Sequence, residues 1–171
     1  MADLNHAQTV STENRGGPWF PVVLIAIGVG IVLSGIFTGA TGLYGDDGAI
    51  TWSDGFKEAG REFARLILFS VLLLAALRVN CWRVRRPLGN VLLAALRCFA
   101  IIALIESVRV AQIPSGVERI LLISAGQYIV CSIGVMVLFS MTIRETVLFV
   151  SWCTVGTVLL WVGAHLGIWI A

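Results

Sequence analysis

The feature that most constrains this chain is a stretch of thirty residues without a single charge, residues 16–45. An α-helix needs about 20 apolar residues to cross the hydrocarbon core of a membrane, which is about 30 Å thick. Hydrophobic residues make up 58% of the 171-residue chain and charged residues only 13%, so a soluble fold would leave much apolar surface in contact with water. The sequence therefore predicts an α-helical integral membrane protein.

Four more apolar segments follow the first one. The five expected spans cover residues 19–43, 63–79, 88–112, 120–143 and 147–171. The connections after the third and fourth spans are short, so these helices are expected to be antiparallel neighbours. We expect an all-α bundle of five transmembrane helices that forms one domain over residues 19–171. Four spans with a re-entrant segment are the second choice, because the third segment carries three charges.

The distribution of basic residues predicts the orientation of the bundle. Residues 78–90 hold four arginines and no acid, whereas residues 44–62 hold five acids and two basic residues. Lys and Arg collect in cytoplasmic loops, so we expect the N-terminus inside, the C-terminus outside and a location in the plasma (inner) membrane. Residues 1–18 are polar and lack the basic region of a signal peptide. We expect them to form a disordered N-terminal tail.

A helix is also expected just before the second span. Ser53 or Asp54 is a candidate N-cap, because the short side chains of these residues accept hydrogen bonds from the first turn of a helix. Such a helix would either lie at the membrane interface or continue directly into the second span.

One arginine lies inside the third expected span. Arg97 ends the second of two LLAALR segments, residues 73–78 and 92–97, a match that we interpret as coincidence. It lies seven residues past Asn90, or about 10 Å along a helix. In one interpretation its side chain reaches back to cytoplasmic water. In the other it holds a specific partner, such as the Gln127 amide.

The fourth expected span carries a polar face in an otherwise apolar helix. Ser124, Gln127, Tyr128 and Cys131 follow a spacing of i, i+3, i+4 and i+7, which places them on one side. Polar side chains at this depth normally face other helices or a wet cavity, so we expect this face to turn toward the third span. It would serve helix packing, a path for a solute or a proton, or a catalytic or cofactor pocket.

Other polar and small residues are candidates for contacts within the membrane. Glu106 and Arg109 are three residues apart and are expected to pair near the outer surface. His165 lies between two tryptophans at intervals of four residues, which is more typical of an aromatic belt than of a ligand site. Helix packing is expected at two GxxxG patterns, formed by Gly35 and Gly39 and by Gly163 and Gly167.

Several chemistries do not fit this sequence. The four cysteines show no C-x-x-C spacing, and His165 is the only histidine in an apolar segment, so no metal site or cofactor is expected. The basic residues lie at segment ends, which does not fit nucleic-acid binding.

We therefore expect a non-catalytic structural, accessory or assembly component of a membrane complex. Its expected partners are the lipid bilayer and other membrane subunits or a second copy of the chain. The alternative is a protomer of a small-solute or ion transporter or channel that acts as an oligomer.

Reporters fused to Ala171 test the predicted topology. We expect a reporter that works only outside the cytoplasm to be active and a reporter that works only inside to be inactive, because the 78–90 segment should hold its end of the bundle in the cytoplasm. An active cytoplasmic reporter would show that the number of spans or their orientation is different.

Overall fold

The computed structural model describes residues 17–38, 52–84, 88–110 and 117–170, and within these ranges it contains helices and no strand. The elements are α1 (Trp19–Thr38), α2 (Trp52–Val84), α3 (Val91–Ser107), the short 3-10 helix η1 (Val108–Val110), α4 (Val117–Phe139) and α5 (Ile143–Ile170). The all-α prediction is confirmed. Among the described residues, three segments are long and apolar enough to cross a membrane, Trp19–Thr38, Val91–Val110 and Leu121–Phe139, as in a multi-pass membrane protein.

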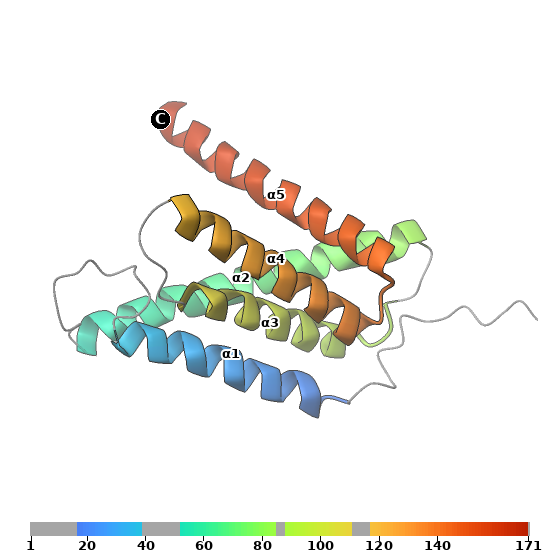
Figure 1. The fold of residues 1–171 in the computed structure, drawn as a ribbon, viewed down its shortest axis with the longest axis horizontal. Coiled ribbons are helices and arrows are strands. Elements are labelled where there is room, and N and C mark those ends of the chain that lie inside the picture. Colours follow the sequence, from blue (N-terminus) through green and yellow to red (C-terminus); the bar gives the residue numbers. More distant parts are fainter. Residues whose placement is uncertain (1–16, 39–51, 85–87, 111–116, 171) are drawn as a thin grey trace, which may run out of the picture.

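The helices are arranged around α3. Figure 1 shows α1 beside α3 and running in the same direction, while α2 and α4 run in the opposite direction. Among the described residues α3 contacts α1, α2 and α4, whereas α5 contacts only α4 and α2. α5 therefore forms the outer edge of the bundle (Figure 1).

Small residues bring α1 close to α3. A Cβ atom at Gly28 would lie only 2.7 Å from the carbonyl carbon of Ala103, so the two backbones almost touch. Gly35, expected to be a packing residue, is buried two turns further along α1. Its partner in the pattern, Gly39, lies outside the described residues, as do the surroundings of Gly163 and Gly167 in α5.

α2 is longer than the expected span of residues 63–79, because the helix expected before it runs straight into it. Its first turns are amphipathic, and Trp52 and Phe56 form an aromatic cluster with Phe37 of α1, with ring centroids 5.5 and 5.8 Å from Phe37. Aromatic side chains are favoured where a membrane meets water. The cluster fixes the start of α2 to the end of α1.

The turn between α4 and α5 is defined by a capping box. Thr142 donates its backbone N–H to the Glu145 carboxylate at 3.0 Å, and the Glu145 backbone N–H donates to the Thr142 hydroxyl at 3.4 Å. Ser140 has a left-handed backbone, with φ of 51°, which ends α4 and reverses the chain. Only three residues therefore separate the end of α4 from the start of α5.

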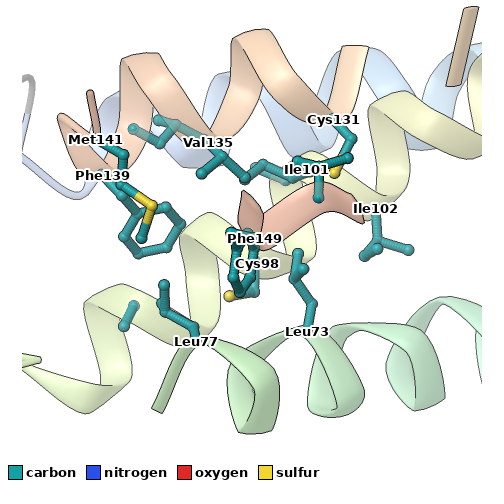
Figure 2. Packing of buried hydrophobic residues seen from close by; sticks show 14 of the residues in the cluster. Leu73, Leu77, Cys98, Ile101, Ile102, Cys131, Val135, Phe139, Met141 and Phe149 are labelled. Carbon is teal, nitrogen blue, oxygen red and sulfur yellow. The ribbon is translucent and has the colours of Figure 1, made fainter. Parts of the chain in front are cut away.

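The apolar core is built from α2, α3, α4 and α5. Figure 2 shows Leu73 and Leu77 of α2 near Cys98 of α3, whereas Ile101 of α3 lies beside Cys131 and Val135 of α4. Val135 and Phe139 of α4 and Phe149 of α5 complete the same buried cluster.

Gly28→Ala should destabilise the bundle by about 1–3 kcal/mol, because the added methyl group has no room against Ala103. Gly30→Ala is the matched control, since a Cβ atom there meets nothing within 4 Å. It should leave the stability unchanged or raise it by up to about 1 kcal/mol. Denaturant unfolding in detergent measures both variants, and equal losses would contradict the close contact of α1 with α3.

Candidate functional site

A groove of about 800 Å³ lies between α2 and α5, and α3 and α4 form its floor. Its walls are mostly apolar, with polar groups at several points. The side chains that matter for its chemistry come from α2 (Arg65, Phe69, Ala76, Asn80, Arg83), α3 (Ile102, Glu106), α4 (Ser124, Gln127, Tyr128, Cys131) and α5 (Trp152, Thr154, Gly156, Thr157).

The polar face that spacing predicts on α4 lines this groove. Ser124 is exposed, Gln127 is half-buried, and Tyr128 keeps 36% of its surface exposed. Cys131 is the buried member of the set and points into the apolar floor. The four side chains thus line one open groove together with Glu106 of α3.

Four charged side chains cluster where α2 meets the end of α3. Arg109 donates to Glu106 at 2.9 Å and lies 3.9 Å from Glu62. Arg65 lies 3.6 Å from Glu62 and 3.9 Å from Glu106. The two carboxylates are only 8% and 7% exposed, so each needs a compensating cation. We call this neutral set of two acids and two arginines the charge quartet.

The spacing of three residues between Glu106 and Arg109 predicts an ion pair, and the structure contains this pair. The contribution of α2 was not anticipated from the sequence, because contacts between helices are not encoded in local spacing. A signal was nevertheless present: Glu62 and Arg65 are also three residues apart on a helix that leads into a span.

Arg65 and Glu106 connect the charge quartet with the groove. Both line it, and the guanidinium of Arg65 also lies 5.5 Å from the ring centre of Phe69 in the same wall. One end of the groove is therefore polar but electrically balanced.

Arg97 is completely buried, with 0% of its surface exposed. Its Nη1 donates to the backbone carbonyl of Leu138 at 2.8 Å. Leu138 lies in the last turn of α4, where carbonyl groups lack a partner within the helix and carry partial negative charge. Arg97 therefore caps the C-terminus of α4.

This contact agrees with the interpretation that Arg97 holds a specific partner, but the partner is the Leu138 carbonyl and not the Gln127 amide. The side chain points toward the start of α3, as its lean along the helix predicts, but it ends on a protein carbonyl rather than in water. The carbonyl that it binds lies eleven residues beyond Gln127, or about 16 Å along α4.

The groove combines apolar side chains with a few hydrogen-bonding and charged groups. Within the described ranges, no group of three or more His, Cys, Asp or Glu side chains is placed to hold a metal ion. Cys98 and Cys131 are buried free thiols in apolar surroundings. His165 belongs to α5, but its side chain lies outside the described part of the chain. What the groove offers is a long apolar surface with polar groups near its ends.

Arg97→Leu should change two measurements in opposite directions. Membrane insertion of residues 88–112 in a host protein should improve by up to about 3 kcal/mol, because the cost of a central arginine disappears. The stability of the folded bundle should fall by about 1–3 kcal/mol, because the Leu138 carbonyl loses its donor.

The control is Arg78→Leu, which removes the exposed arginine of the other LLAALR segment and should change the stability by less than about 0.5 kcal/mol. Arg97→Lys should fall between Arg97→Leu and the unmodified chain, since an ammonium can donate to a carbonyl but lacks the planar fork of the guanidinium. Full stability of Arg97→Leu would restore the interpretation that this side chain only reaches for water.

Comparison with known proteins adds no assignment to this geometry. The chain matches no protein-family model, no curated protein and no solved structure. The function of the groove and of the buried charges must therefore be inferred from the residues that form them.

Proposed function

We propose that this chain is a membrane protein with five spans that acts as a non-catalytic accessory or assembly component of a membrane complex. α2 and α5 lie alongside the three candidate spans (Figure 1). They contain 33 and 28 residues, or about 50 and 42 Å of helix, which exceeds the thickness of a hydrocarbon core of about 30 Å. In this proposal the N-terminus is cytoplasmic and the C-terminus is outside.

Every charged side chain of α3 and η1 contacts a neighbouring helix, and this observation carries the proposal. Arg97 caps α4, and Glu106 and Arg109 belong to the charge quartet with α2. Charges that hold neighbouring helices together are typical of a packing function. They support a rigid bundle better than a site that must change its protonation or release a substrate.

The position of α5 indicates where a partner would bind. α5 is the edge helix (Figure 1), and its residues Leu148, Val155 and Val162 are exposed. These residues recur every seven positions and therefore form one stripe along the helix. A helix of another membrane subunit, packed on this stripe, would give α5 neighbours on both sides.

A transporter or channel protomer is the second candidate. It is favoured by the polar face of α4, because Ser124, Gln127 and Tyr128 share the groove with two members of the charge quartet. A single groove open on one side does not enclose a path, so this function would require several copies of the chain.

Native mass spectrometry of the full chain, extracted in mild detergent from the cells that produce it, tests the proposal. We expect a complex of fixed stoichiometry with a different membrane protein. Val155→Trp should weaken this complex at least tenfold, whereas Ile31→Trp, at a comparably exposed position on α1, should leave it intact.

A closed ring of identical chains would instead support the transporter. A monomer, or a complex that both tryptophan variants weaken equally, would contradict the proposed partner surface on α5.

A further inference from the structure

The groove between α2 and α5 has the length of a membrane's hydrocarbon core. Along α2 it extends from Arg65 to Arg83, which are eighteen residues and therefore about 27 Å apart, close to the core thickness of about 30 Å. Between these two arginines its wall on α2 is apolar apart from Asn80, with Phe69, Leu72 and other aliphatic side chains.

The two ends of the groove differ in charge. Arg65 lies within 4 Å of two carboxylates, those of Glu62 and Glu106, so this end is neutral. Arg83 lies in the last turn of α2 with an exposed side chain. In the part of the chain that the structure describes, no acidic side chain forms an ion pair with it. Asn80 lies three residues earlier on the same side of α2 and lines the same end.

The volume of the groove fits hydrocarbon chains. If a methylene group takes about 30 Å³, the share of one water molecule in the liquid, then about 800 Å³ holds about 27 methylene groups, or two acyl chains of ordinary length. A helix 27 Å long and 10 Å wide would fill about 2,100 Å³. The groove can therefore enclose two acyl chains, whereas it could take only one side of a helix.

We infer that this groove binds one phospholipid with an anionic headgroup. The phosphate lies at Arg83 and Asn80, which offer a guanidinium fork and an amide donor. The acyl chains follow the apolar wall of α2 toward the charge quartet. Arg83 belongs to the arginine-rich end of α2, which is cytoplasmic in the proposed topology, and anionic lipids are concentrated in the cytoplasmic leaflet. The inference does not depend on whether the chain has a protein partner.

Competition between two lipids tests the headgroup site. The purified full chain is equilibrated with phosphatidylglycerol and phosphatidylcholine of the same acyl chains, and native mass spectrometry counts the lipids that remain bound. We expect one phosphatidylglycerol per chain. Arg83→Gln should reduce its retention about fivefold, the effect of roughly 1 kcal/mol per basic residue at an anionic lipid surface.

Arg78→Gln is the matched control, because Arg78 is an exposed arginine of the same helix that is not among the groove residues. It should leave retention within about twofold of the unmodified chain. Equal losses with Arg78→Gln and Arg83→Gln would overturn the inference, since they would show only a general attraction of basic residues to anionic lipid.

A second pair of variants tests the position of the acyl chains. Gly156 lines the groove, and a Cβ atom there meets nothing within 4 Å, so Gly156→Leu fills the groove without a backbone clash. It should lower the retention of both lipids at least fivefold, whereas Gly30→Leu, which also projects into open space from α1, should not. Undiminished retention in Gly156→Leu, or release of a bound polypeptide in place of lipid, would overturn the inference.

Discussion

An ionised side chain inside a membrane costs about 2.5–3.5 kcal/mol in insertion experiments unless other groups replace its water. α3 and η1 bring Arg97, Glu106 and Arg109 into the bundle, and the rest of the structure supplies the replacement. The Leu138 carbonyl in the last turn of α4 accepts a hydrogen bond from Arg97. The α2 side chains Glu62 and Arg65 balance the charges of Arg109 and Glu106. The position of α3 between α2 and α4 follows from these contacts as much as from its apolar surface.

Close backbone contact is the second element of this architecture. Lipid tails are as apolar as leucine, so burial alone gives helices little reason to associate in a membrane. Gly28 lets α1 approach Ala103 of α3, which adds many short-range contacts. Gly134 of α4 makes room for a side chain instead of a backbone, since a Cβ atom there would lie 2.9 Å from the side chain of Ile101. α3 is thus held by small residues on two sides and by charges at both ends.

Local spacing in the sequence predicted the features that depend on one helix. The polar face of α4 and the pair of Glu106 and Arg109 follow from helical periodicity alone. Contacts between different helices leave no such periodic pattern in the sequence. Arg97 and Leu138 are 41 residues apart, and a backbone carbonyl has no signature in the sequence. The packing role of Gly28 has no GxxxG signature, because no glycine lies four residues before or after it.

The distance between Arg97 and Leu138 along the chain also has a consequence for biosynthesis. At about 5–20 residues per second, a ribosome needs about 2–8 s to make the 41 residues that separate the guanidinium from its acceptor. When Arg97 is added to the nascent chain, the end of α4 does not yet exist. The Arg97 guanidinium can therefore reach its acceptor only after α4 has been made, so the docking of α4 on α3 is the step that completes the burial of this charge.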